Sequence, residues 1–315
     1  MPAAASQPAP PYTTGGYVRQ QGTFTGRVSR DGSTGFLAEP GRYHLYASLA
    51  CPWSHRALIV RRLLGLDRFI GLSLTDPIVG EHGWQFLDSA GARDPITGAR
   101  FLSELYLASD PSYAGRCTVP FLWDAKTQRI VTNDIPQITV QLETEFAAFH
   151  RPGAPELYPP PLRREIDALA TLIYHTVNNG VYKAGLATSQ AAYEEAFDAL
   201  FTTLDALEER LARRRFLLGA QLTEADVRLF PTLARFDAVY YLHFKCNLHR
   251  LADYPHLWAY ARDLYQRPGF ADTTDFAQIK RHYYQTQNWI NPSRIVPKGP
   301  YVSWLAPHGR DRMPG

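Results

Sequence analysis

The segment Cys51-Pro52-Trp53-Ser54-His55-Arg56 most constrains the fold of this chain, because it separates two different periodicities. Before it, residues 42–46 alternate in polarity, which predicts a strand. After it, residues 54–66 carry apolar side chains at helical spacing and include Gly65 near their end, which predicts a helix. Residues 69–74 predict a second strand. This part of the chain is therefore expected to form a strand–helix–strand unit with parallel strands and a right-handed crossover.

Cys51 is expected at or just before the first turn of this helix. Free backbone N–H groups at a helix N-terminus stabilise a thiolate, which is the nucleophilic form of cysteine. Pro52 suits the first helical position, and His55 or Arg56 would add positive charge nearby. Ser54 stands where a Cys-x-x-Cys site has its second cysteine, so a mixed disulfide at Cys51 would need an external thiol for its release. The alternative is a buried, inert cysteine.

The other two cysteines, Cys117 and Cys246, lack this context and are expected to be structural. Three widely spaced cysteines do not make a disulfide framework and favour a reducing, cytoplasmic setting. Residues 1–16 have neither the basic region nor the apolar stretch of a secretory signal. No run of about 18 apolar residues predicts a membrane span, so no membrane partner is expected.

Composition excludes further classes of function. The chain has 315 residues, 45% of them hydrophobic and 20% charged, which is typical of one large or two ordinary globular domains. A formal net charge of +3 gives no electrostatic footprint for nucleic acid. Aromatic residues make up 13% and favour flat apolar ligands. His243 and His282 lack partners at metal-ligand spacing, so no metal site is expected.

Changes in texture along the chain predict its domain organisation. Residues 1–40 are expected to form an irregular N-terminal extension, and residues 41–150 an α/β domain with a loop-rich insertion at 75–116. The proline-rich stretch 151–161 is the expected linker. Residues 162–290 predict an all-helical domain, and residues 291–315 a tail. The expected helices cover 134–149, 162–177, 190–214, 224–242, 256–266 and 275–284, and the expected later strands 118–123 and 129–132.

Thr118-Val119-Pro120 opens one of these strands. In thioredoxin-like folds a cis-proline faces the active cysteine, and the residue before it offers its backbone N–H and C=O groups to the peptide part of a thiol ligand. The tripeptide alone is a weak signal, because cis X–Pro bonds are a minority overall. It gains specificity from the Cys51-Pro52 turn upstream.

With these motifs in place, the stretch from about residue 42 to residue 300 resembles the glutathionyl-hydroquinone reductases, the Xi class of the glutathione transferase superfamily. The matching segments are CPWSHR (51–56), GW (83–84), GRCTVP (115–120), NNGVYKAG (178–185), LTEADVRLFPT (222–232), HFKC (243–246), KRHYY (280–284) and INPSRIVP (290–297). The resemblance implies a thioredoxin-like N-terminal domain, an all-α C-terminal domain and a homodimer. It also implies reduction of a glutathionyl-hydroquinone through a mixed disulfide on the cysteine, released by a second glutathione.

The resemblance also implies roles for individual residues. Cys51 matches the nucleophile, and Trp84 matches a tryptophan that packs against glutathione. Arg116 and Val119, with Pro120 next to it, match residues near the carboxylate and peptide backbone of glutathione. Tyr182 and Tyr283 match tyrosines that line the quinone pocket, where a phenolic O–H would stabilise the oxyanion of a departing hydroquinone. Motif spacing favours Tyr283 over Tyr284, and packing is the alternative for each tyrosine.

One departure from the family concerns Asp134 and Ile135, where many members have Glu-Ser. In the superfamily this acidic–hydroxyl pair holds the γ-glutamyl end of glutathione. Asp134 keeps a shorter carboxylate and Ile135 has no hydrogen-bonding group, so the expected result is a weaker glutathione site or a site for another low-molecular-weight thiol such as mycothiol or bacillithiol. Helix N–H groups or other residues could instead compensate.

Two alternatives to the reductase remain open at this stage. The first is a general thiol–disulfide exchanger, including dehydroascorbate reductase activity, which would use the same cysteine. The second is a non-catalytic protein that kept the fold, since fold alone does not assign function. A conjugating transferase is disfavoured because it needs a Ser or Tyr that stabilises the thiolate of the co-substrate, whereas a cysteine traps it as a disulfide.

Overall fold

The computed structural model describes residues 12–13, 15–87 and 93–313 and divides them into two compact units. The described part of unit 1 comprises Gln20–Ala154 and Ala277–Gln287. Unit 2 comprises Pro155–Phe276, Asn288–Gly315 and the short stretch Pro10–Arg19, except where these run outside the described residues. Among the described helices, none combines the length and the apolar character needed to cross a bilayer.

A four-stranded mixed sheet forms the centre of unit 1, in the order β6-β5-β7-β8. Strand β5 (Tyr43–Ala47) runs parallel to β6 (Gly71–Leu74) and antiparallel to β7 (Phe121–Asp124), which pairs antiparallel with β8 (Arg129–Thr132). The parallel β5–β6 pair spans the expected strand–helix–strand unit. All five residues of β5 are buried, as expected for a strand covered on both faces.

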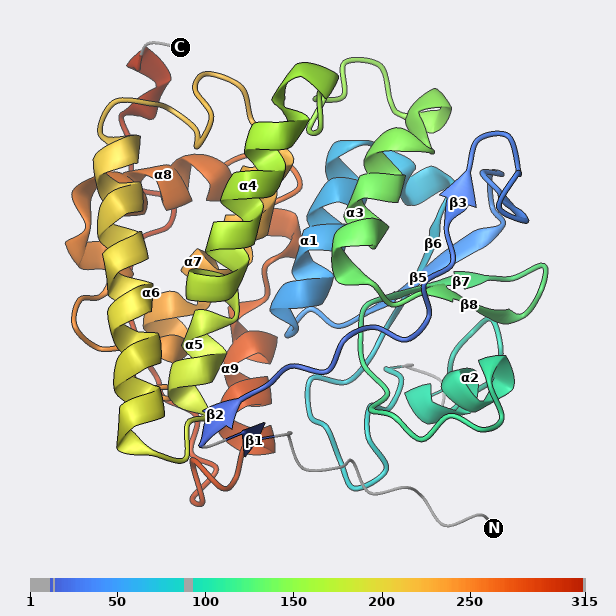
Figure 1. Ribbon diagram of the computed structural model, residues 1–315, viewed down its shortest axis with the longest axis horizontal. Helices are drawn as coiled ribbons and strands as arrows, with labels where there is room; N and C mark the ends of the chain where they lie inside the picture. Colours follow the sequence, from blue (N-terminus) through green and yellow to red (C-terminus); the bar gives the residue numbers. More distant parts are fainter. Residues whose placement is uncertain (1–11, 14, 88–92, 314–315) are drawn as a thin grey trace. The chain divides into compact units, whose positions relative to one another are not determined.

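Helices α1 (Pro52–Leu63) and α3 (Ile135–Thr144) lie side by side and pack on this sheet (Figure 1). Helix α2 (Leu102–Ser109) contacts β8. All of α9 (Phe276–Thr286) except its first residue belongs to unit 1, although it comes from the far end of the chain. Smaller elements of unit 1 are β3 (Val28–Ser29), β4 (Phe36–Leu37) and the 3₁₀ turns Leu66–Arg68 and Ala147–Phe149.

A buried polar network ties the 93–99 loop to the sheet. Asp94 accepts hydrogen bonds from Ser73 Oγ at 2.5 Å and from Tyr46 Oη at 2.7 Å, and Ser73 Oγ also lies 2.8 Å from His44 Nε2. Burial opposes ionisation of Asp94, but the hydrogen bonds from Ser73, Thr97 and Tyr46 outweigh it and hold the pKa of this carboxyl below its usual value. The network therefore holds an ionised carboxylate inside the unit.

Unit 2 is built from helices. Helix α6 (Gln190–Leu211) packs beside α5 (Gly180–Gly185) and α8 (Pro255–Tyr265), while α4 (Arg163–Ile173) packs beside α7 (Glu224–Arg235). At the start of α7, the carboxylate of Asp226 accepts from the N–H of Thr223 at 2.8 Å, which forms a capping box. Short elements complete the unit: β1 (Tyr12–Thr13), β2 (Gly16–Tyr17), the π turns Tyr174–Asn178 and Phe236–Tyr240, and the 3₁₀ turns Pro160–Leu162, Leu251–Asp253, Ala271–Thr273 and Arg310–Arg312.

The C-terminal tail is anchored into unit 2 by two side chains. Arg310 is only 2% exposed and donates to the main-chain carbonyls of Leu211, Arg214 and Arg215, where α6 ends. Leu211 is the last residue of α6, and Arg214 and Arg215 follow it, so the guanidinium caps the end of the helix and holds the turn after it. The ring of Trp304 packs edge-on against Trp258 on α8 at 4.8 Å between centroids.

The units divide the chain differently from the expected domains at two places. The boundary at 154/155 falls inside the expected linker, but α9 was expected in the helical domain and clusters with unit 1. Residues 15–19 of the expected extension cluster with unit 2, and residues 1–11 and 14 of that extension lie outside the described residues. Two helices predicted as continuous, 162–177 and 224–242, change to π turns near their ends, a change that apolar spacing over one turn does not reveal.

Candidate functional site

Cys51 lies where the chain passes from β5 into α1. It is the N-cap residue of α1, with φ −80° and ψ 123°, and its side chain makes no capping hydrogen bond. Its carbonyl accepts from the N–H of His55 at 3.0 Å, and Pro52 occupies the first helical position, where a missing N–H costs nothing. The thiol is free and only 6% exposed. Sequence reasoning therefore placed this cysteine correctly at the start of the helix.

The Val119–Pro120 segment faces this thiol. The Val119–Pro120 peptide bond is cis, and Cys51 Sγ lies 3.6 Å from the carbonyl oxygen of Val119. The main chain just before β7 thus meets the start of α1. This is the arrangement that the two motifs predict together.

Tyr106 on α2 supports that segment and was missed by sequence reasoning. Its hydroxyl donates to the carbonyl of Thr118 at 2.7 Å and accepts from the N–H of the same residue at 3.2 Å. It also accepts from Asn133 Nδ2 at 3.3 Å. Burial raises the pKa of Tyr106 to about 12, so the hydroxyl keeps its proton at neutral pH. The sequence showed only a tyrosine in a stretch without a clear helical pattern, which is a weak signal for a residue that holds the site.

Ser54 lies in the first turn of α1 and is fully buried. Its Oγ accepts a hydrogen bond from the backbone N–H of Ser48 at 3.2 Å, which fixes the turn that precedes Cys51. The guanidinium of Arg56 lies 4.7 Å from the ring centroid of Trp53. The site is therefore a one-cysteine site whose neighbouring polar groups brace the turn.

The two remaining cysteines have different surroundings. Burial raises the pKa of the Cys117 thiol to about 11, and burial also raises the pKa of the Cys246 thiol. Both side chains are therefore protonated at neutral pH and are poor nucleophiles. These environments agree with the structural role expected for them.

Trp84 lies in a loop that leaves β6 and folds back on itself, residues 75–87, called here the Trp84 loop. β-bridges pair Thr75 with Phe86 and Gly80 with Gly83. Gly83 adopts a φ of +83°, a backbone conformation that would be strained in a residue with a side chain. The ring of Trp84 is 8% exposed and stacks on the imidazole of His282 from α9, with 5.3 Å between centroids and 14° between planes.

The remaining thiol-site candidates of unit 1 lie around the ends of its strands and helices. Arg116 donates its backbone N–H to Gln20 Oε1 at 3.2 Å, and its carbonyl accepts from Tyr113 Oη at 2.9 Å. Asp134 is the N-cap residue of α3, and its carboxylate accepts from the N–H of Gln137 at 3.4 Å. Ile135 is the first residue of α3 and is half-buried. Asp134 thus already serves the helix as a cap.

The two candidate quinone tyrosines belong to different units. Tyr283 on α9 is fully buried in unit 1, and its neighbour Tyr284 is 4% exposed with its pKa raised to about 12 by burial. Tyr182 on α5 belongs to unit 2, where its ring packs 5.4 Å from that of Phe244. The guanidinium of Arg19 lies 4.6 Å from the Tyr182 ring centroid, a cation–π distance.

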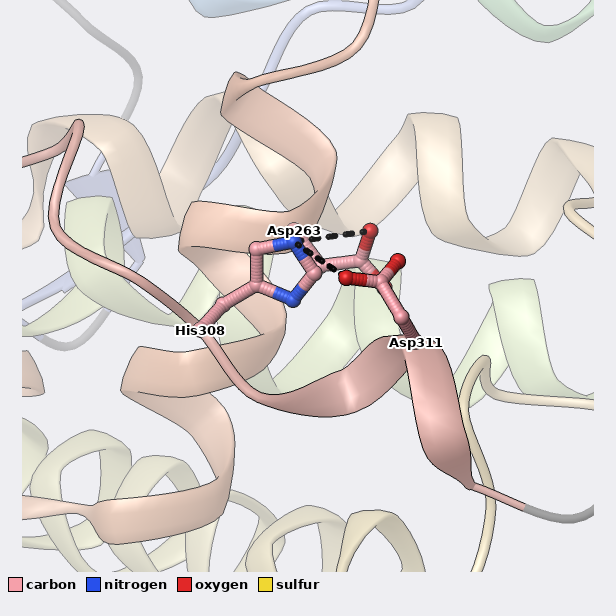
Figure 2. A group of neighbouring side chains, drawn as sticks. All are labelled: Asp263, His308 and Asp311. Carbon is pink, nitrogen blue, oxygen red and sulfur yellow. Dashed lines mark ion pairs between the residues drawn. The ribbon is translucent and has the colours of Figure 1, made fainter.

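The described residues also include a group that could be mistaken for a metal centre. Asp263, His308 and Asp311 bring their ligand atoms within 4.8 Å of one another, and Figure 2 shows the imidazole beside the two carboxylates. Arg215 bonds both carboxylates, at 2.9 Å to Asp263 and 2.6 Å to Asp311, and Arg267 also bonds Asp263 at 2.9 Å. Two guanidinium groups at this range oppose a cation, so the group is an ion-pair cluster that holds the C-terminal tail to α8.

Comparison with known proteins places this geometry in a family. Residues 190–263 match the model of the glutathione S-transferase C-terminal domain. The chain is 48% identical over 307 residues to the glutathionyl-hydroquinone reductase YqjG of Escherichia coli, covering 95% of this chain and 93% of that protein. The glutathione-bound structure of YqjG superposes with a TM-score of 0.88, covering 92% of this chain and 96% of that one.

Two further solved structures are similar over most of their length. A glutathione transferase from Gordonia bronchialis has a TM-score of 0.90 and 54% identity, covering 93% of this chain and 91% of that one. The Xi glutathione S-transferase of Phanerochaete chrysosporium has a TM-score of 0.88 and 45% identity, covering 92% of this chain and 99% of that one. These matches confirm the expected architecture of a thioredoxin-like domain followed by an all-helical domain.

Proposed function

We propose that this chain, which belongs to the glutathionyl-hydroquinone reductase family of Xi-class glutathione transferases, reduces S-glutathionyl-hydroquinones by thiol exchange at Cys51. The observation that carries the proposal is the position of Cys51: a free thiol at the N-cap of α1, 3.6 Å from the carbonyl of Val119. Cys51 lies at the positive end of the α1 helix dipole, which suits a sulfur that carries negative charge when it attacks.

The proposed reaction has two balanced steps. The Cys51 thiolate attacks the sulfur of the conjugate, so a Cys51–glutathione disulfide forms and the bond between that sulfur and the aromatic carbon breaks. The electron pair of that bond stays on the ring, which takes up a proton and leaves as free hydroquinone. The thiolate of a second glutathione then attacks the mixed disulfide, giving glutathione disulfide and the Cys51 thiolate. Ser54 offers no second thiol, so the external glutathione is required.

We assign the thiol ligand to residues of unit 1. The backbone of Val119, which follows the Thr118 held by Tyr106, would pair with the cysteinyl part of glutathione. The Trp84 ring would pack against the same ligand, and Arg116 would bind one of its carboxylates. Glutathione itself is the co-substrate favoured by the family, and no metal enters the mechanism.

Asp134 and Ile135 offer few hydrogen bonds to the γ-glutamyl end of glutathione, so this end would be the most weakly bound part of the ligand. The Asp134 carboxylate already accepts from Gln137, and the Ile135 side chain offers no donor or acceptor. A thiol without a γ-glutamyl group, such as mycothiol or bacillithiol, would lose nothing here. The choice between these thiols is therefore a part of the test.

Tyr182 and Tyr283 are proposed for the hydroquinone. Each would donate its phenolic proton to an oxygen of the leaving group and stabilise the negative charge that develops there. We further propose a cytoplasmic homodimer. Large apolar side chains exposed in the tail and just before it support the dimer, since exposed apolar groups mark interaction surfaces. They are Trp289, Ile295, Tyr301 and Leu305.

Intact-mass measurement tests the proposal directly. Wild-type protein and Cys51→Ala are exposed briefly to menadione conjugates of glutathione, mycothiol and bacillithiol, and released hydroquinone is measured in parallel. We expect an adduct of one thiol on the wild type alone, with one hydroquinone released per adduct. Full activity of Cys51→Ala would refute the proposal. Labelling of Cys51 by a small disulfide but by none of the conjugates would favour a general thiol–disulfide exchanger.

A further inference from the structure

The Trp84 loop is held by one face of α9. In the proposed reaction, Tyr283 is the one residue of this helix that has a role. His282 and Thr286 are four residues apart and therefore project from the same face of the helix. His282 meets the loop twice, through the ring stack with Trp84 and through the 2.6 Å contact between its Nδ1 and the carbonyl of Pro77. Thr286 meets it once, by accepting from the N–H of Val79 at 3.2 Å.

The contact with Pro77 fixes the chemical state of the imidazole. A carbonyl oxygen can only accept, so Nδ1 carries the proton and donates it. This bond and the ring stack act together, because the first sets the plane in which the imidazole lies and the second places Trp84 parallel to that plane. Both the descending arm of the loop, at Pro77, and the returning arm, at Trp84, are thereby tied to one side chain.

The backbone of the loop is held on both sides of Trp84, and Gln85, the residue after it, forms a bridge with Phe101. The Gly80–Gly83 bridge closes a tight turn, and the positive φ of Gly83 aims the chain back toward α9. The backbone of Trp84 is fixed by a bond from the N–H of Leu102 to its carbonyl at 2.9 Å. The direction of the indole ring is then set by the imidazole against which it stacks.

We propose that His282 is a positioning residue for the thiol site: it orients the Trp84 ring against the thiol ligand and, through the next residue on α9, links that ring to Tyr283. This inference rests on the proposed function, because it assigns Trp84 to thiol binding. It assigns to the KRHYY motif a role beyond its tyrosines. His282 itself touches neither the ligand nor the reacting sulfur in this proposal.

Three variants separate the two contacts that His282 makes. His282→Phe keeps a ring for the stack and removes the donor to Pro77. His282→Asn keeps an N–H donor on a short side chain and removes the ring. His282→Ala removes both. His82→Ala is the matched control, since His82 lies in the same loop but packs its ring on Phe101 at 5.3 Å.

The measurements are KM and kcat for glutathione with glutathionyl-menadione as substrate, and the change in indole fluorescence on glutathione binding, referred to a Trp84→Phe protein. Each contact is worth about threefold to tenfold in affinity. We expect His282→Ala to raise the KM for glutathione by about tenfold with kcat changed less than about twofold. His282→Phe and His282→Asn should each recover part of the affinity for glutathione. The fluorescence change on glutathione binding should be smallest in His282→Ala and intermediate in these two variants.

Unchanged KM values in all three His282 variants, or an equal rise in His82→Ala, would overturn the inference. A fall in kcat alone, with KM and fluorescence unaltered, would also overturn it, because a general loss of structure or of chemistry would then be the cause. If His282→Ala does not fold, the Phe and Asn variants carry the comparison. Failure of the wild type to form a Cys51 adduct would instead refute the proposed function, so the two failures are distinguishable.

Discussion

The hydroxyl of Ser54 accepts a hydrogen bond from the backbone N–H of Ser48 at 3.2 Å. Ser54 stands where a Cys-x-x-Cys site has its second cysteine, and here it braces the turn before Cys51. In a Cys-x-x-Cys site that position holds the resolving thiol. The chain has the geometry of a dithiol site but the composition of a monothiol one.

Ser54→Cys should therefore change how the enzyme intermediate is released. The new thiol would attack the Cys51 mixed disulfide from within the protein, and the product would be an internal disulfide. Intact mass after exposure to a conjugate should show the loss of two hydrogens instead of a thiol adduct. Ser54→Ala is the control and should retain the adduct. A stable thiol adduct on Ser54→Cys would show that the fourth position cannot reach the sulfur.

Ile135→Ser should strengthen binding of glutathione. It restores a hydroxyl beside Asp134 at the start of α3, and a hydrogen bond to a charged group changes affinity by about tenfold or more. The KM for glutathione should fall by about that factor, while the KM for mycothiol or bacillithiol should not change. Ile135→Val is the matched control. An unchanged glutathione KM in Ile135→Ser would mean that other groups already hold the γ-glutamyl end.

Asp124→Asn should destabilise the protein strongly. Arg42 donates to the Asp124 carboxylate through Nε at 2.9 Å and Nη2 at 2.8 Å, and the Asp124 side chain is fully buried. The Arg42 guanidinium then keeps its ion pair with Glu39 at 2.8 Å but loses the fully buried carboxylate, which costs about 3 kcal/mol in the free energy of unfolding. Urea denaturation measures this. Asp67→Asn at the exposed Arg62–Asp67 pair should cost less than about 1 kcal/mol. Equal costs at both pairs would contradict the argument from burial.

Stability should fall at mildly acidic pH because of His44. Burial lowers the pKa of His44 below its ordinary value of 6.5, although the Asp94 charge opposes the shift. As pH falls below 6.5, the unfolded chain takes up a proton that the folded protein does not yet bind. The free energy of unfolding should then decrease until the folded pKa is reached, by at most about 1.4 kcal/mol per pH unit.

His44→Gln tests this prediction, since it cannot titrate. Its free energy of unfolding should change less than that of the wild type between pH 7 and the acid range below 6.5. The same pH dependence in wild type and variant would assign the effect to other groups.

The sequence predicted the position of the reactive cysteine better than the contacts that hold the surrounding segments in place. The position of Cys51 and the approach of Val119 followed from strand and helix periodicities and from two prolines, which are local signals. The role of Tyr106 did not follow, because the N-cap residue of α2 is Phe101, which signals no helix start. The Glu104 side chain accepts from the N–H groups of Arg100 and Phe101 instead. The stack of Trp84 on His282 joins residues 198 positions apart (282 minus 84), and no local pattern encodes such a contact.

Because α9 belongs to unit 1, this unit cannot complete its folding until the chain has been synthesised through α9. Residues 20–154 leave the ribosome first, yet the partner of the Trp84 loop is not made until residue 286. Unit 2 waits longer still, because Arg310, which donates to the carbonyl of Leu211 at the end of α6, is made 99 residues after it. Neither unit can reach its final form as a free nascent domain. A nonsense mutation before codon 310 would thus leave α6 without the guanidinium that caps it.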